Sequence, residues 1–273
     1  MIYITGDTHA EFHRFSQKTF SATAEDYVII CGDFGGVWDR SAEQKYWLDW
    51  LAEKPWTTLF VDGNHENYDL LATYPVERWH DGNVHFIRSN VIHLMRGQVF
   101  EIEGLRFFVM GGAASHDIDS GILELDDPDF YVKRRRLDRA RALYRINHLS
   151  WWKEEMPSEE EYAEGLANLE KVGNQVDVIL SHCAPSSIQE IFSGGFYKKD
   201  QLTDYLDQIR ERCTFKRWFF GHYHENMEVG QKYVMLYEMI IPLLEYLPEE
   251  EGQYKTIPRC TKPATARDVD FCV

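Results

Sequence analysis

Gly221-His222-Tyr223-His224 places two histidines one residue apart, directly after the apolar run Arg217-Trp218-Phe219-Phe220. At the end of a β-strand, such a pair sends its two side chains to opposite sides of the backbone. One short segment can therefore serve two neighbouring metal ions. A single His-x-His pair is more often a surface or core feature than a metal site, so the interpretation depends on the rest of the chain.

Four further segments repeat the pattern of a short, β-favouring run that ends in an Asp, Asn or His. They are Ile2-Tyr3-Ile4 before Gly6-Asp7-Thr8-His9, Tyr27–Cys31 before Gly32-Asp33, Thr58–Val61 before Gly63-Asn64-His65-Glu66, and Val176–Leu180 before Ser181-His182. In a sheet whose strands share a direction, these ends meet in one crevice, where open α/β sheets bind ligands. The sequence therefore predicts that these polar side chains gather at one site.

The pattern of apolar residues changes along the chain. Strand-like and helix-like segments alternate up to about residue 75, and Ser41 is expected to cap a helix with Tyr46, Trp47 and Trp50 in the core. Residues 84–113 instead contain successive β-rich stretches, which predicts a second sheet packed on the first. We expect one domain over residues 1–273, with an insert at about 114–157 and a polar tail from about 248.

Composition narrows the possible functions. The chain has 273 residues, 44% of them apolar, and a formal net charge of -16. This charge argues against a protein that binds extended nucleic acid, but a small phosphorylated substrate remains possible because metals set the local field of a site. The absence of a membrane-length apolar run and of a leader at Met1 predicts a cytoplasmic protein without membrane partners. Five cysteines without repeated spacing predict no disulfide framework.

Taken together and in this order, the five motif segments resemble the calcineurin-like metallophosphoesterases. The resemblance covers about 220 residues and implies a four-layer α/β/β/α sandwich of two mixed sheets. It also implies a metal-dependent phosphoric ester hydrolase. By this resemblance, one metal ion would be held by Asp7, His9 and His224, the other by Asn64, His182 and His222, and both by a bridging Asp33.

The residue types of this set indicate the metal and the chemistry. Carboxylate and amide oxygens with imidazoles suit two divalent ions, with Mn²⁺ the first expectation and Fe or Zn²⁺ the alternatives, whereas a structural zinc site would contain thiolates. Two ions about 3.5 to 4 Å apart would supply a bridging hydroxide for in-line attack on phosphorus. By resemblance, His65 is not a ligand but the catalytic residue that protonates the leaving oxygen.

One segment departs from the family pattern. Many members, the protein phosphatases among them, have Gly-Asp-x-x-Asp-Arg in the second segment, but here Gly36 replaces the second Asp and Asp39-Arg40 comes three residues later. Either these two residues reach back to the site or other groups support His65 and grip phosphate. The candidates for that grip are Arg40, His116, Asp117 and the arginine-rich segment 134–145, although a solvated helix face is the simpler interpretation of the last.

The sequence favours a hydrolase acting on a small phosphorylated molecule, a nucleotide or another phosphomonoester or phosphodiester. A serine/threonine-type protein phosphatase is the alternative that Gly36 weakens. A binding scaffold that keeps the fold without turnover is a third, although degenerate sites lose ligands and here all eight matching positions are present. A nuclease partnered with other subunits also stays open.

Overall fold

The apolar segments that precede the first three motifs form the centre of one sheet. The computed structural model describes residues 1–248. In this sheet β1 (Ile2–Thr5), β2 (Tyr27–Cys31), β3 (Thr57–Val61) and β6 (Val91–Leu94) run parallel. Antiparallel β15 (Ile241–Pro242), β5 (Gly82–Arg88) and β4 (Val76–Trp79) complete the order β15-β1-β2-β3-β6-β5-β4.

The two remaining motif strands belong to a second sheet. Its parallel strands are β14 (Tyr233–Met235), β12 (Arg217–Phe220), β11 (Val178–Ser181) and β8 (Leu105–Met110). Antiparallel β13 (Met227–Val229) and β7 (Gln98–Ile102) lie at its edges, in the order β13-β14-β12-β11-β8-β7. The β-rich stretch that we assigned to a second sheet is divided between the two, because β5 and β6 join the first and only β7 and β8 join the second.

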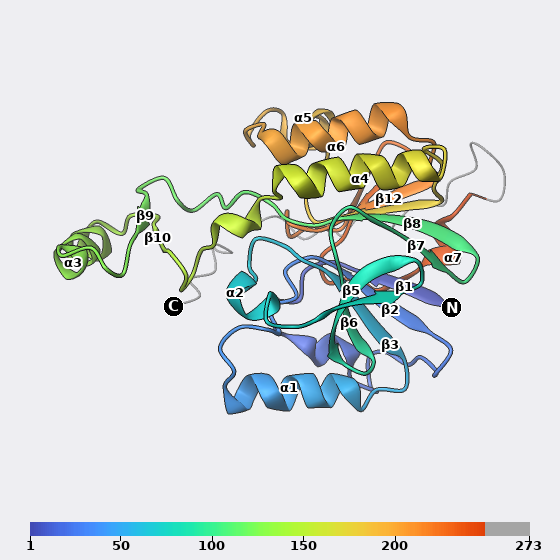
Figure 1. The fold of residues 1–273 in the computed structure, drawn as a ribbon, viewed down its shortest axis with the longest axis horizontal. Coiled ribbons are helices and arrows are strands. Elements are labelled where there is room, and N and C mark those ends of the chain that lie inside the picture. The colour runs from blue at the N-terminus through green and yellow to red at the C-terminus, as the bar shows by residue number, and fades with distance from the viewer. Residues whose placement is uncertain (249–273) are drawn as a thin grey trace.

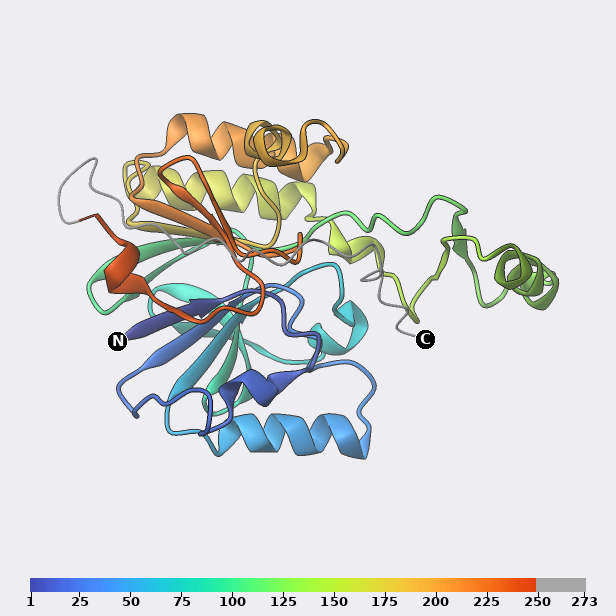
Figure 2. The ribbon, with the colours of Figure 1, turned by 180° about the vertical axis from the view of Figure 1, so that it is seen from behind.

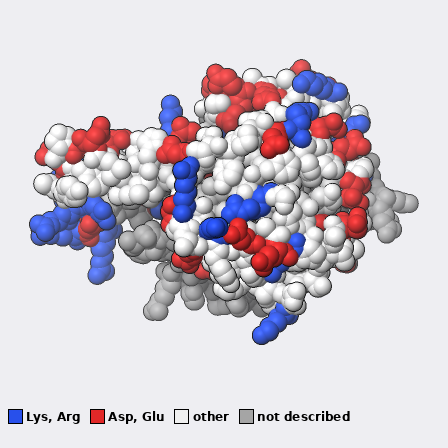
Figure 3. Space-filling model, turned by 60° about the horizontal axis from the view of Figure 1, so that its bottom comes forward, with Lys and Arg blue, Asp and Glu red and all other residues white. Residues whose placement is uncertain are grey.

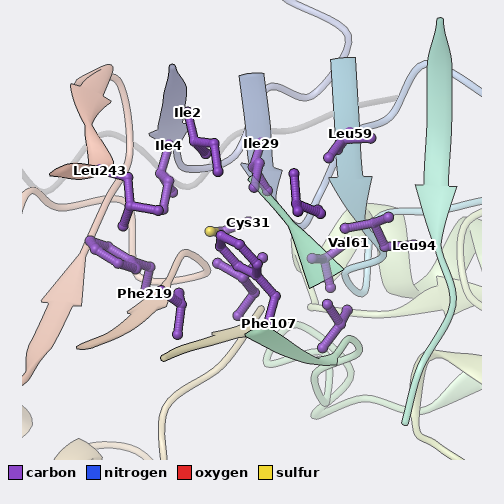
Figure 4. Close-up of a cluster of buried hydrophobic side chains, with 14 of the residues drawn as sticks. Ile2, Ile4, Ile29, Cys31, Leu59, Val61, Leu94, Phe107, Phe219 and Leu243 are labelled. Atoms are coloured by element: carbon purple, nitrogen blue, oxygen red, sulfur yellow. The ribbon is translucent and has the colours of Figure 1, made fainter. Parts of the chain in front are cut away.

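The two sheets pack face to face with helices on both outer faces (Figures 1 and 2). Helix α1 (Ala42–Ala52) covers the first sheet, and α4 (Glu159–Lys171), α5 (Ser186–Ser193) and α6 (Gln201–Arg212) cover the second. Side chains from both sheets fill the space between them (Figure 4), among them Ile4, Ile29, Leu59, Phe107 and Phe219. The predicted α/β sandwich of two mixed sheets is confirmed.

The helix starts follow the polar residues expected to cap them. The Ser41 side chain accepts a hydrogen bond from Gln44 N, and Ser158 forms a capping box with Glu161. These contacts satisfy backbone N–H groups that lack a partner within the first helical turn. The prediction that Tyr46 is a core residue is wrong: it lies on the outer side of α1 and is 60% exposed.

Shorter elements complete the described chain. They are the 3-10 helices η1 (Phe12–Phe15) and η2 (Lys153–Glu155) and the helices α2 (Tyr68–Leu71) and α7 (Leu243–Tyr246). Cys31, Cys183 and Cys213 are free thiols. Within residues 1–248 no helix is long and apolar enough to cross a membrane. The predicted polar tail lies almost entirely outside the described residues, and the single-domain organisation stays a prediction, which the core shared by both sheets supports.

The insert (residues 114–157) projects from the side of the molecule where the motif strands end (Figures 1 and 2). It contains β9 (Ile122–Leu123), which pairs with β10 (Arg145–Ile146), and α3 (Phe130–Ala140). A small apolar cluster of its own holds these elements together. Trp152 lies where the insert returns to the rest of the molecule and is fully buried. Its Nε1 donates a hydrogen bond to Asp69 Oδ2 over 2.7 Å, which attaches the insert there.

Two buried histidines on adjacent strands give the fold a dependence on pH. The Nδ1 atoms of His85 and His93 lie 3.2 Å apart, and His93 Nε2 lies 3.1 Å from Asp62 Oδ1. Burial, reinforced by His93 and only partly opposed by Asp62, lowers the pKa of His85 from 6.5 to about 4. The folded state therefore holds His85 in its neutral form.

We predict that stability falls as the pH drops from 6.5 toward 4, because the unfolded chain then binds a proton at His85 that the folded chain refuses. The contribution of this one group is about 3 kcal/mol across that window. Chemical denaturation of the wild type and of His85→Gln at pH 7 and pH 4.5 measures it. An equal loss of unfolding free energy in both proteins would assign the effect to other groups.

Candidate metal centre

The loops after β1, β2 and β12 bring one group of potential ligand atoms together. His224 Nε2 lies 3.1 Å from His9 Nε2 and 3.3 Å from Asp7 Oδ2. His9 Nε2 lies 3.8 Å from Asp33 Oδ2. Donors that share a divalent ion at about 2.1 Å each lie roughly 3 to 4 Å apart, depending on the angle between them, so this spacing suits a common cation. The ligand set proposed for the first metal is thus assembled in one place.

A second group lies beside the first, between the two sheets. His182 Nε2 is 3.2 Å from both Asp33 Oδ1 and Asn64 Oδ1, while His182 Nδ1 faces the Cys31 carbonyl oxygen at 2.9 Å. The His222 ring lies 4.9 Å from the His182 ring. Asp33 therefore faces both groups, as a bridging ligand must. Asp7 is also near both, because Asp7 Oδ1 is 3.9 Å from His182 Nδ1.

The charge of the centre fits divalent cations. Asp7 and Asp33 are both buried. Burial opposes the charged form of His182, but Asp33 and Asp7 outweigh this effect and raise the pKa of His182 to about 10. The two carboxylates thus require positive charge between them. Divalent cations would supply that charge and leave the imidazole nitrogen free as a ligand, and the oxygen and nitrogen donors match Mn²⁺, Fe or Zn²⁺.

The motif glycines Gly63 and Gly221 are required because ligand carboxylates lie where a Cβ atom would stand. A Cβ atom on Gly63 would lie 2.1 Å from Asp33 Oδ1, and one on Gly221 would lie 2.0 Å from Asp7 Oδ1. Any larger residue would push a carboxylate out of the centre. The ligands themselves carry strain, because Asp33 and His222 are non-glycine residues with φ of 44° and 71°. Such backbone conformations concentrate at functional sites.

Asn64 is oriented by two residues that the sequence did not reveal. Ser115 donates from N and Oγ to the buried Glu155 carboxylate over 2.8 and 2.6 Å. Burial raises the pKa of Glu155 to about 7, and above that pH its ionised carboxylate takes the only hydroxyl proton of Ser115. Ser115 Oγ then accepts from Asn64 Nδ2, which lies 3.5 Å away. The amide oxygen of Asn64 consequently faces His182. Glu155 lies 91 residues further along the chain, where no sequence pattern connects it with Asn64.

Two arginines, Arg96 buried and Arg14 half-buried, support the loops that hold the proposed ligands. Arg96 pairs with Asp62, which directly precedes Gly63, and also donates over 2.9 Å to the carbonyl oxygen of Glu154 in the insert. Arg14 donates to the carbonyl oxygen of Asp7 over 2.7 Å. Neither arginine follows a motif strand, so strand-end patterns could not identify them. Their shared role is to fix the backbone on which the proposed ligands are mounted.

His65 stands next to the two groups of ligands. Its ring centroid is 5.2 Å from that of His9, and its backbone N–H donates to Asp33 Oδ1 over 2.8 Å. Burial lowers the pKa of His65, and the neighbouring Asp33 opposes this shift. The imidazole is therefore near the metal centre without belonging to either group of ligand atoms.

The departure at Gly36 has a packing cause. A Cβ atom there would lie 2.5 Å from the Phe34 ring, so a carboxylate side chain has no room at this position. Asp39 does not replace it, because its carboxylate accepts from Ser41 N over 2.8 Å. Instead Glu66 secures this loop by accepting from Phe34 N over 2.7 Å.

The three residues proposed to bind substrate have different surroundings. Arg40 is exposed and contacts Thr73 Oγ1 over 3.4 Å, which places it in a surface hydrogen bond outside the ligand groups. His116 adjoins the centre, because its Nε2 lies 2.9 Å from His222 Nε2. Asp117 forms an ion pair with Arg145 of β10, which closes the base of the insert.

Comparisons with known proteins agree with this geometry. The family model described as calcineurin-like phosphoesterase matches residues 1–226. Lariat debranching enzymes are among the relatives: that of Caenorhabditis briggsae is 25% identical over 64% of this chain, and those of Homo sapiens and Drosophila melanogaster are 22% and 21% identical over 82% of it. The matches span only 34% to 42% of these relatives' own length.

We predict that Glu155→Gln lowers the affinity for the metal ion at the Asn64 side by about 10- to 100-fold. An amide in place of the carboxylate can donate to Ser115 Oγ, and the Ser115 hydroxyl group would then donate to Asn64 instead of accepting from it. Isothermal titration with Mn²⁺ measures the two sites separately. Glu154→Gln, an adjacent exposed position, is the matched control and should bind both ions as the wild type does. Unchanged affinity in Glu155→Gln would show that Asn64 does not depend on this contact.

Proposed function

The chain belongs to the calcineurin-like phosphoesterase family, and on that basis we propose that it is a metal-dependent phosphoric ester hydrolase. The observation that carries the proposal is the convergence of two buried carboxylates, one amide and four imidazoles from five strand ends. The proposed ligands are Asp7, His9, Asp33, Asn64, His182, His222 and His224, and the metal we favour is Mn²⁺. Cytoplasmic location stays a prediction.

The residues of the chain divide the catalytic work. Two bound divalent ions would lower the pKa of a water molecule and neutralise phosphoryl oxygens. Asp33 contacts donors of both groups and so fixes their separation. His65, beside them, is the proposed general acid for the leaving oxygen. The buried walls around Asp7 and Asp33 exclude bulk water and strengthen every charge interaction in the centre.

The substrate class we favour is a phosphodiester that contains a nucleotide. The relatives named above are lariat debranching enzymes, and this supports a diester over a monoester. The geometry disfavours the protein phosphatase alternative, because Gly36 cannot hold the missing carboxylate and Arg40 is engaged with Thr73 at the surface. The scaffold alternative would be expected to have lost ligand residues, whereas this sequence keeps a residue of the matching type at every proposed position, which supports the hydrolase.

One observation favours a longer, polynucleotide substrate. Helix α3 exposes Arg135, Arg136 and Arg139, which form no ion pair within residues 1–248. Figure 3 shows Lys and Arg side chains gathered on one side of the insert, with acidic side chains on the other. The net charge of the chain hides this local concentration. A polyanion that enters the centre could extend along this basic side of the insert.

We predict that Mn²⁺-loaded protein hydrolyses nucleotide diesters faster than monoesters and phosphopeptides, and that His65→Ala lowers kcat by about 100- to 10,000-fold while both ions stay bound. Turnover of a substrate panel and metal analysis by mass spectrometry measure the two effects. Full activity in His65→Ala would remove it from the mechanism. An inactive wild type with two bound ions would favour the scaffold.

For the polynucleotide candidate we predict that replacing Arg135, Arg136 and Arg139 with Ala reduces the slope of log K against log salt by about 2 for a single-stranded oligonucleotide, because three phosphate contacts are lost. Fluorescence anisotropy with the metal-loaded His65→Ala protein measures the slope. Replacing the exposed Lys18, Lys45 and Lys171 gives the same net charge and should leave the slope unchanged. Equal slopes in both triple variants would rule out the insert as a binding surface.

A further inference from the structure

A row of aromatic rings leads from the metal centre to the protein surface. The His116 ring lies 4.9 Å from that of His222 and 5.1 Å from that of Tyr197. Phe196 continues the row, with its ring 5.1 Å from Tyr197 in an edge-on arrangement. The last ring is 81% exposed. We call Phe196 and Tyr197 the aromatic lip.

The lip is fixed to the ligand-bearing motif rather than to the surface. Tyr197 packs at 5.0 Å against Tyr223, the residue between His222 and His224. Phe192, at the end of α5, packs at 4.7 Å against the same ring. Tyr223 is itself held by hydrogen bonds from its hydroxyl group to Gln189 and from Ala184 N to that hydroxyl group. The lip and the metal centre therefore share one buried anchor.

The backbone explains how Phe196 comes to stand in solvent. Gly194 ends α5 in the left-handed conformation, and Gly195 follows with φ of 86°. These two residues turn the chain outward immediately before Phe196. A large apolar ring in water costs free energy. Among the aromatic residues described, only Tyr131 of α3 is as exposed as Phe196, and Tyr131 packs against Phe130 of its own helix, whereas Phe196 belongs to the row of rings.

We propose that the aromatic lip is a stacking subsite for the nucleobase next to the scissile phosphate. This proposal rests on the proposed function and specifies its substrate. Aromatic rings stack on any base, because each base has a π-face, so the lip would select for nucleotides without selecting a sequence. The exposed Lys198 lies next to Tyr197 in the chain and adds positive charge for a flanking phosphate.

A nucleobase suits this lip better than a protein partner does. The exposed surface is a single ring continuous with three further rings that lead inward, whereas a protein interface needs a broad apolar patch. The connection between α5 and α6 lies on the same side of the molecule as the insert (Figures 1 and 2), so a nucleotide chain could contact both from one centre.

Phe196→Ala tests the lip by comparing two substrates. A dinucleotide and its analogue with an abasic sugar beside the same phosphodiester are hydrolysed with Mn²⁺, and the ratio of their kcat/KM values is measured. We expect Phe196→Ala to lower this ratio about tenfold, and Phe196→Trp to restore it. Ile191→Ala is the matched control, because Ile191 is an exposed apolar residue of α5, 69% exposed, outside the row of rings. An unchanged ratio in Phe196→Ala, or an equal loss in Ile191→Ala, would overturn the proposal.

A binding measurement separates this proposal from the proposed function. A dinucleotide carrying 2-aminopurine is titrated into metal-loaded His65→Ala protein, in which turnover is suppressed. Stacking on Phe196 should quench its fluorescence, and the added Phe196→Ala change should abolish the quenching. Quenching without hydrolysis by the wild type would support the lip and contradict the hydrolase. Hydrolysis by the wild type without quenching would contradict the lip alone.

Discussion

The structure depends on the burial of two carboxylates, Asp7 and Asp33, where the two sheets meet. Each follows a parallel strand, and each would be intolerable without positive charge close by. The fold surrounds them with imidazoles from four loops, and the pKa of His182 shows how strongly they favour a cation. Stability and the proposed catalysis are therefore linked at this point. The carboxylates whose charge the folded chain must neutralise are the ones proposed to bind divalent ions and so to attract a phosphate.

The strand ends explain why these residues converge, but the supports explain why they are held in place. Glu155 and Ser115 orient Asn64, Arg96 neutralises Asp62 beside the same loop, and Arg14 fixes the backbone of Asp7. Two of these contacts come from the insert and its return to the body. The insert is thus part of the construction of the centre as well as a candidate binding surface.

Sequence predicted the motif residues and the sheets because both leave local patterns: β-favouring runs, glycines and polar strand ends. Contacts between distant segments leave none, so Glu155, Arg96 and the aromatic lip became visible only in three dimensions. The exposure of Tyr46 was not predicted, because the aromatic and aliphatic residues of α1 cover a wider face of the helix than the one that packs on the sheet. The arginine-rich segment was visible in the sequence, but the net charge of -16 gave no indication of where on the molecule those arginines lie.

The proposed metal centre depends on Asp33 joining two metal ions. Electron paramagnetic resonance of the Mn²⁺-loaded protein, together with its metal content, is the sharpest test of this role. We predict two ions per chain with an exchange-coupled spectrum, and the loss of that coupling in Asp33→Asn. A single ion per chain, or two ions that remain magnetically independent in the wild type, would contradict it.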